Sequence, residues 1–413
     1  MKSDLDAIMQ ANSIDVLLVL GPAQHNPAMY YLTGGGHLTR AEVIKKRGEP
    51  AVLFHWPMER DEAAKSGLET RNSMLYPYRD LLAEAGGDRG KVDAVRYARK
   101  LKDLGVTSGR VALYGVVELS SAFATLAELQ RRMPELEFVG DPGQSIIGAA
   151  MITKDSAEIE RIRRMGRITT EVVGRVQDFL TSRPVDEQEQ LIGPDEEPLT
   201  IGRVKSLINL WLAELGADNP EGTIFAIGRD AGVPHSAGNP TDVMRLGQTV
   251  VFDIFPCEQG GGYYYDFTRT WCLGYAPVEV QQIYEQVREV YDTLVKELQM
   301  GQPFGIYQER ACELFEAMGH PSVKSTPETM EGYVHGIGHG IGLKIHERPL
   351  NSSSAPTEDL LVPGVVITIE PGLYYPSKGY GVRLENSLVL REDGTFEVLS
   401  EFPMDLVLKM KGT

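Results

Sequence analysis

Four acidic residues stand in segments that are otherwise apolar and strand-like. Asp253 lies within Thr249–Phe255 (TVVFDIF), and Asp266 lies within Tyr263–Trp271 (YYYDFTRTW). Both segments are rich in the β-branched and aromatic residues that favour strands. A carboxylate buried in such a strand is costly as a bare charge, so it needs a cation, a metal ion or a proton. The glycines of CEQGGG between the segments predict a hairpin that brings Asp253 and Asp266 side by side.

A second acidic pair follows the same pattern further along the chain. Val365–Pro371 (VVITIEP) is predicted to be an apolar strand with Glu370 near its end. Gly381–Leu390 (GVRLENSLVL) is predicted to be one strand, with Arg383 and Glu385 on the same face because side chains alternate. Turn residues between these segments predict a second hairpin. The chain would thus offer two hairpins with two carboxylates each.

A glycine-rich run, HGIGHGIGLKIHE, places His335, His339 and His346 within twelve residues. Its glycines disfavour a helix, so this is not the helical HExxH zinc motif. Any one of these acids or histidines alone is more often a solvated polar group, but four acids in matching hairpins favour a site. Such an oxygen-rich set with one imidazole suits a pair of divalent metal ions, with Mn²⁺ favoured and Co²⁺, Zn²⁺ or Fe²⁺ admitted. Two ions can activate a shared water and polarise a carbonyl, which is hydrolytic chemistry.

The elements that must hold these residues indicate two domains. Strand-like and helical segments alternate over residues 1–150, which predicts an α/β domain. Asp155 is the expected N-cap of a long amphipathic helix, so the second domain is predicted to span 151–413. Two helices precede each acidic strand pair, which predicts two similar halves sharing one site. The other predicted helices are Lys91–Leu104, Ser120–Arg131, Ile201–Leu215, Val278–Gln299 and Phe304–Met318, and the other strands are Val16–Leu20, Ala51–Trp56, Arg110–Gly115 and Leu136–Val139.

Composition narrows the class of protein further. The 413 residues are 42% hydrophobic and 24% charged, which is typical of a globular protein with a sizeable core. A net charge of −17 without a basic patch argues against nucleic acid as a partner. We expect no membrane span and no secretion signal. Three cysteines without CxxC spacing argue against disulfides and fit a cytoplasmic location.

Six motifs resemble, in order, those of the creatinase/prolidase/aminopeptidase P family. They are VPHSAG, VVFDIF, YYYDFTRTW, HGIGHGIGLKIHE, TIEPGLYY and GVRLENS, and they cover most of residues 150–413. NPAMYYLTGG (Asn26–Gly35) resembles a stretch of the family's N-terminal domain. The resemblance is greatest to Xaa-Pro dipeptidases and Xaa-Pro aminopeptidases. It implies a creatinase-like α/β N-terminal domain and an α+β pita-bread catalytic domain with pseudo-twofold halves.

The family's five metal ligands fall on residues of the motifs quoted above. By that resemblance Asp253 would bind one metal ion, and His339 and Glu370 would bind the other. Asp266 and Glu385 would bridge the two ions.

The resemblance also implies roles around the metal site. Glu370 would act as general base, and His346 and His235 would contact the substrate as catalytic residues. His335 and Arg383 would line the substrate pocket, with Arg383 holding metal ligands in place from behind.

The activity implied by the resemblance is hydrolysis of the peptide bond preceding proline in short peptides, by a homodimer. The compact N-terminal domain favours a dipeptidase over an aminopeptidase. Alternatives are a metal-dependent lyase or a small-molecule amidohydrolase on the same fold, or a pseudo-peptidase that only binds peptides. The complete ligand set disfavours a metal-free relative and a pseudo-peptidase. Phe255 and Pro256, in a turn slightly longer than the family's, are expected to reshape one pocket wall, which leaves the substrate preference open.

Overall fold

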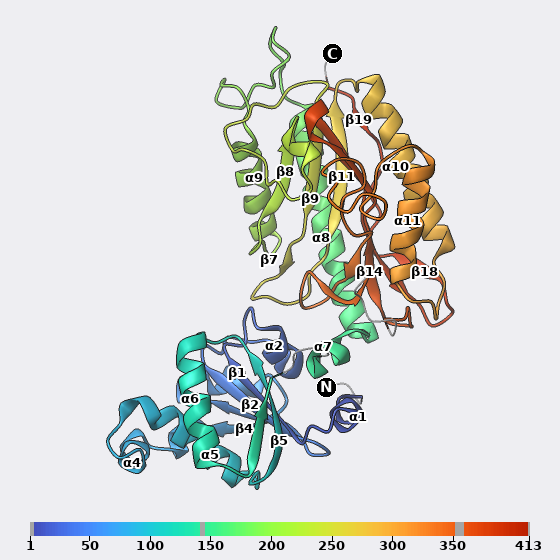
Figure 1. The fold of residues 1–413 in the computed structure, drawn as a ribbon. Coiled ribbons are helices and arrows are strands. Elements are labelled where there is room, and N and C mark those ends of the chain that lie inside the picture. Colours follow the sequence, from blue (N-terminus) through green and yellow to red (C-terminus); the bar gives the residue numbers. More distant parts are fainter. Residues whose placement is uncertain (1–3, 141–144, 352–358, 412–413) are drawn as a thin grey trace. The chain divides into compact units, whose positions relative to one another are not determined.

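The chain folds as two compact units in the computed structural model, which describes residues 4–140, 145–351 and 359–411. Unit 1 comprises residues 1–151 together with Gly260–Gly262, and unit 2 comprises residues 152–259 and 263–413 (Figure 1). Among the described residues, none of the helices combines the length and apolar character needed to cross a membrane.

Unit 1 is built on a six-stranded mixed sheet in the order β4-β3-β2-β1-β5-β6. The central strand β1 pairs antiparallel with β2 and parallel with β5. Buried side chains of helices α4, α5 and α6 pack with one face of the sheet. The strands are β1 (Val16–Gly21), β2 (Ala41–Lys46), β3 (Val52–His55), β4 (Glu69–Asn72), β5 (Gly109–Gly115) and β6 (Leu136–Val139). The helices are α1 (Leu5–Ala11), α2 (Pro27–Thr33), α3 (Arg60–Ala64), α4 (Tyr78–Glu84), α5 (Val92–Asp103), α6 (Leu119–Arg132) and α7 (Ile146–Met151).

The predicted strands and helices of this unit are confirmed to within a few residues. The short helices α2, α3, α4 and α7 and the strand β4 were missed. The buried strand β2 was also missed. Its sequence, AEVIKK, carries three charged residues, which hide a buried strand from pattern reasoning. Glu42 is nevertheless 2% exposed, because Lys100 of α5 lies 2.9 Å from its carboxylate. Lys45 is likewise buried and pairs with Asp6. Buried charges of this kind persist only when they are paired.

The first half of unit 2 is a four-stranded sheet in the order β19-β11-β9-β8, accompanied by two helices. The predicted N-cap is confirmed: Asp155 accepts hydrogen bonds from Ala157 N and Glu158 N, and the Glu158 side chain accepts one from Asp155 N, which is a capping box. The elements are α8 (Ser156–Thr181), α9 (Ile201–Glu214), β8 (Thr223–Ile227), β9 (Thr249–Ile254), β11 (Phe267–Leu273) and β19 (Val407–Leu408), with a small sheet of β7 (Ala217–Asp218) and β10 (Cys257–Glu258) beside them.

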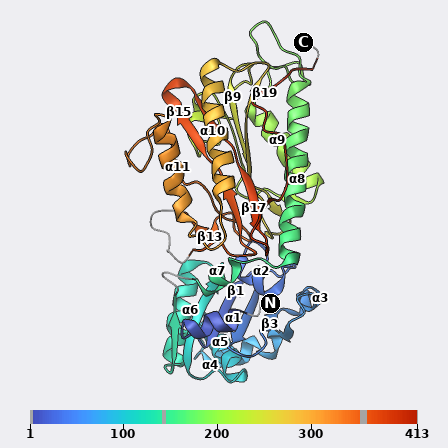
Figure 2. The same ribbon diagram turned by 90° about the vertical axis from the view of Figure 1, so that its right-hand side faces the viewer.

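The second half of unit 2 repeats this plan with a five-stranded sheet in the order β13-β12-β14-β17-β18. Helices α10 and α11 run side by side along it (Figures 1 and 2) and share its apolar core. The elements are α10 (Val278–Glu297), α11 (Gly305–Ala317), β12 (His339–Gly340), β13 (Glu347–Leu350), β14 (Val366–Ile369), β17 (Asn386–Leu390) and β18 (Phe396–Val398), and a separate hairpin of β15 (Gly372–Tyr375) and β16 (Tyr380–Arg383).

The single strand predicted over 381–390 is wrong, because the chain changes partners in the middle of it. Strand β16 pairs with β15, whereas β17 pairs with β14. Between them, Glu385 forms an isolated antiparallel bridge with Thr268 of β11. This bridge joins the two halves of unit 2, and its hydrogen bonds replace those that a continuous strand would have made.

All three cysteines are buried in unit 2, and each carries a thiol rather than a disulfide. Cys257 and Cys272 belong to strands of the first half, and Cys312 belongs to α11 of the second. Burial raises the pKa of Cys272 to about 12. The expectation that the cysteines form no disulfides is therefore confirmed.

Candidate metal centre

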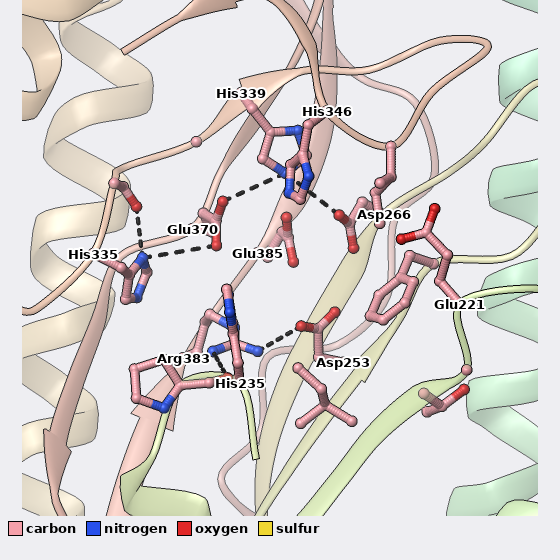
Figure 3. A pocket seen from close by; sticks show the side chains of 18 of the residues that line it. Glu221, His235, Asp253, Asp266, His335, His339, His346, Glu370, Arg383 and Glu385 are labelled. Atoms are coloured by element: carbon pink, nitrogen blue, oxygen red, sulfur yellow. Dashed lines mark hydrogen bonds and ion pairs between the residues drawn. The ribbon is translucent and has the colours of Figure 1, made fainter. Parts of the chain in front are cut away.

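One cavity of about 590 Å³ in unit 2 gathers the metal-binding, catalytic and substrate-binding residues predicted from the sequence (Figure 3). The residues come from both halves, from segments up to 150 positions apart. The cavity is large enough for a short peptide, since small-molecule sites occupy about 300–1,000 Å³. The predicted residues that line it are His235, Asp253, Asp266, His335, His339, His346, Glu370, Arg383 and Glu385.

The first acidic pair is held by the predicted hairpin of β9 and β11. Asp253 in β9 lies opposite Thr268, and Asp266 immediately precedes β11. Arg383 of the other half donates from Nη2 to Asp253 Oδ2 at 2.5 Å. The second oxygen, Asp253 Oδ1, is buried without a hydrogen-bond partner among the described residues. The hairpin therefore presents a carboxylate that is only half satisfied.

The second acidic pair sits where strands end. Glu370 directly follows β14, and Glu385 lies between β16 and β17. Thr268 of the first half donates from Oγ1 to Glu385 Oε2 at 2.7 Å. Glu385 Oε1 is buried and, within the described part of the chain, has no partner. Each acidic pair is thus supported by a residue of the opposite half and keeps one free buried oxygen.

His339 reaches the carboxylates from the short strand β12. Its Nδ1 lies 3.1 Å from Gly340 O, and because a carbonyl can only accept, Nδ1 carries the proton. The other ring nitrogen, Nε2, faces Asp266 Oδ2 at 3.5 Å and Glu370 Oε1 at 3.6 Å. Gly338 permits this placement, since a Cβ there would lie 2.0 Å from Thr368 O of β14. The glycines of the run bring β12 against β14, as their permissive backbone suggests.

Electrostatics at this site favour a bound cation. Burial raises the pKa of Asp266 well above its ordinary value, and the Asp253 and Glu370 carboxylates raise it further. Burial also raises the pKa of Glu385, with Asp266 adding to the effect. Carboxylates crowded into one buried site cannot all remain charged unless cations balance them.

The donor set fits divalent metal ions. One ligand atom from each of Asp266, His339 and Glu385 lies within 4.8 Å of the others. The two unpartnered oxygens, Asp253 Oδ1 and Glu385 Oε1, are further buried acceptors without donors. A metal ion would satisfy acceptors that would otherwise cost free energy.

The remaining histidines lie around the acidic cluster. The ring of His346 is 4.4 Å from that of His339, and burial together with His339 lowers the pKa of His346 to about 4. Burial and Arg383 lower the pKa of His335 to about 3. His235 lies beside Arg383 in Figure 3, and Arg383 Nη1 donates to the carbonyl of the preceding residue, Pro234, at 3.2 Å. All three rings are therefore near the carboxylates, and His335 and His346 are neutral at neutral pH.

Sequence reasoning missed two residues that hold this arrangement together. Thr268 Oγ1 donates to Glu385 and accepts a hydrogen bond from Arg383 Nε at 3.3 Å. Tyr374 Oη lies 2.6 Å from Arg383 Nη1 and 2.9 Å from His335 Nε2. Thr268 could have been found, because it follows Asp266 by two positions on a strand and so shares its face. Tyr374 carries no such local signal, since its contacts come from the β15–β16 hairpin.

The Metallopeptidase family M24 model (Peptidase_M24) matches residues 160–392, more than half of the chain. The chain belongs to metallopeptidase family M24. This M24 metallopeptidase is 27% identical over 389 residues to the Xaa-Pro dipeptidase of Pyrococcus horikoshii, a match that covers 94% of this chain and 93% of the relative. The family resemblance read from the six motifs is thereby confirmed.

Solved structures show the fold of the M24 metallopeptidase over nearly its whole length. The prolidase from Pyrococcus horikoshii OT3 matches with a TM-score of 0.73 at 22% identity, covering 98% of both chains. The X-Pro aminopeptidase from Thermotoga maritima matches with a TM-score of 0.73 at 22% identity, covering 95% of this chain and 97% of that chain. The predicted fold class is confirmed: a creatinase-like α/β N-terminal part is followed by an α+β pita-bread part.

Proposed function

We propose that this M24 metallopeptidase uses two divalent metal ions to hydrolyse the peptide bond preceding proline in Xaa-Pro dipeptides. The observation that carries the proposal is the pair of buried carboxylate oxygens without partners, Asp253 Oδ1 and Glu385 Oε1, beside the Asp266–His339–Glu385 cluster. The two oxygens come from different acidic pairs, which supports two ions better than one. The match to an Xaa-Pro dipeptidase along most of both chains supports the substrate.

The five residues that would hold the ions are Asp253, Asp266, His339, Glu370 and Glu385. Four carboxylates and one imidazole favour Mn²⁺ over softer ions. When bound, such ions supply an activated water and polarise the substrate carbonyl. Arg383 would keep Asp253 oriented, because it already donates to one of its oxygens. Outer contacts of this kind fix ligand geometry.

Residues around the ions would then handle protons and substrate. Glu370 is a suitable general base, because its carboxylate lines the cavity and burial raises its pKa. His346, neutral because its pKa is about 4, can donate an N–H to a substrate oxygen. His235 lines the same cavity and would contact the peptide near the scissile bond.

The test is metal-dependent release of proline from Ala-Pro, compared with release of the first residue from Ala-Pro-Ala. Protein stripped by a chelator and reloaded with Mn²⁺ should hold two ions per chain and cleave the dipeptide. Cleavage of the tripeptide instead would make the enzyme an aminopeptidase. If the reloaded protein held two ions but cleaved neither peptide, a lyase or amidohydrolase activity would replace the proposal.

A further inference from the structure

Two residues that line the cavity have basic side chains, Arg383 and Lys205. The guanidinium of Arg383 is engaged within the protein, since it donates to Asp253, Tyr374 and Pro234 O. It is buried and compensates the charge of the acidic cluster. Arg383 therefore has little capacity left for a ligand, which leaves Lys205 to be explained.

Lys205 projects from α9 onto the cavity wall. Its Nζ donates to Ala237 O at 3.0 Å, two residues beyond His235. Phe225 N of β8 donates to the same carbonyl at 3.4 Å, so the ammonium is held against backbone that forms the wall. Ile224, which lines the cavity with Lys205, lies opposite Asp253 in the β8–β9 pairing. Lys205 thus belongs to the same wall as a candidate metal ligand.

The ammonium of Lys205 lacks a counter-charge. Among the described residues, no carboxylate forms an ion pair with its Nζ, although the cavity is lined by several acids. Partial burial lowers the pKa of Lys205, and no neighbouring anion offsets that effect. An ammonium has three donors, and one of them is used by Ala237 O. The remaining donors are available to an anionic group in the cavity.

We propose that Lys205 determines specificity by binding a carboxylate of the peptide substrate. The proposal rests on the proposed peptidase function. A substrate carboxylate entering a cavity rich in Asp and Glu needs a cation, and Lys205 is a lining cation not already committed to an acid. Two parts of a substrate offer this chemistry: the C-terminal carboxylate of a dipeptide, and the side chain of Asp or Glu at the residue preceding proline.

The experiment compares Lys205→Met with the native enzyme on two matched substrate pairs, with Mn²⁺ present. Ala-Pro against Ala-Pro-amide tests the C-terminal carboxylate, and Glu-Pro-amide against Gln-Pro-amide tests the side chain. In the native enzyme we expect one carboxylate-bearing member to have the lower KM. In Lys205→Met its KM should rise by about 10–100-fold, the effect of losing one charge-assisted hydrogen bond, while kcat and the KM of its neutral partner change less than about twofold.

Two further variants separate charge recognition from structure. Lys205→Arg should keep most of the preference, because the charge remains. Arg203→Met, on an exposed turn of the same helix, should leave all four KM values unchanged. Equal losses on acid and neutral substrates, or no change in either pair, would overturn the role of Lys205. Failure of the native enzyme to cleave any of the four substrates would instead overturn the proposed function.

Discussion

The two acidic pairs of the candidate metal centre present the same chemical groups on different frameworks. Asp253 and Asp266 are carried by one hairpin, β9 and β11, whose strands pair in the sheet and are separated in sequence only by the short strand β10 and its turns. Glu370 and Glu385 flank a connection that contains a complete second hairpin, β15 and β16. The first pair is thus assembled locally, whereas the second depends on the packing of an inserted element.

Despite this difference, each pair receives a side-chain hydrogen bond from the opposite half. Arg383 of the second half pairs with Asp253, and Thr268 of the first half donates to Glu385. The candidate metal centre is therefore held by contacts between the two halves. A change in one half should alter the position of the predicted ligands in the other. The predictions below test this reciprocity, beginning with the largest expected effect.

Removing the charge from Asp266 or from Glu385, one acid of each pair, should abolish activity to a similar degree. In Asp266→Asn and Glu385→Gln, Mn²⁺-dependent kcat/KM on Ala-Pro should fall by more than about 10–100-fold. That smaller loss is typical of replacing a residue that contacts a metal ligand but does not itself bind the metal. Steady-state kinetics and metal content measure the effect, with exposed Glu187→Gln as control. A large loss in one variant and near-native activity in the other would mean that the pairs are not equivalent.

Breaking the ion pair that crosses from the second half to the first should destabilise the metal-free protein. Arg383→Met leaves the Asp253 carboxylate buried without a counter-charge, so the free energy of unfolding in urea should fall by about 3–5 kcal/mol. The double variant with Asp253→Asn should recover part of that loss, since no unpaired charge remains. Additive losses in the double variant would show that the two side chains act independently.

Removing the hydrogen bond that crosses in the other direction should weaken metal binding more than stability. Thr268→Val keeps the shape of the side chain but leaves Glu385 Oε2 without its donor, so Mn²⁺ affinity should fall about 10–100-fold by calorimetric titration. Thr249→Val is a matched control on β9, because the Thr249 hydroxyl is buried and makes no hydrogen bond to a described residue. Equal affinities for the two variants would contradict the role of Thr268.

The smallest expected effect on activity comes from a change in the β15–β16 hairpin, which lies between Glu370 and Glu385 in the sequence. Tyr374→Phe removes the hydroxyl that contacts both Arg383 and His335. Loss of a hydrogen bond worth about 1 kcal/mol predicts a decrease in kcat/KM of about fivefold. Tyr375→Phe, next in the same strand, removes a hydroxyl that contacts His320 instead, and should behave like the native enzyme. An unchanged Tyr374→Phe would show that the insert only connects β14 to β17.

Local signals in the sequence predicted much of this molecule. The 3.6-residue period located α8 and α10, and Asp155 marked the start of α8 because its side chain can cap that helix. The β9–β11 hairpin followed from two apolar segments around a glycine-rich turn. The neighbouring positions of Asp253 and Asp266 followed from the same short-range reasoning.

Features that depend on distant partners could not be predicted in the same way. The break at Glu385 is set by its bridge to Thr268, more than a hundred residues away, and nothing in GVRLENSLVL indicates it. Strand β2 was hidden because the partners of Glu42 and Lys45 lie elsewhere in the sequence. The metal-binding and catalytic roles of the cavity residues stay predictions, which the variants above address.

The three buried cysteines allow local unfolding of each half of unit 2 to be measured by thiol modification. A maleimide or disulfide reagent can react only when a local fluctuation exposes a thiol, since all three thiols are buried in the folded chain. Mass spectrometry can therefore follow alkylation of Cys257 and Cys272 separately from that of Cys312, without introducing any label. Because the metal centre joins the two halves, bound Mn²⁺ should slow modification at all three thiols together.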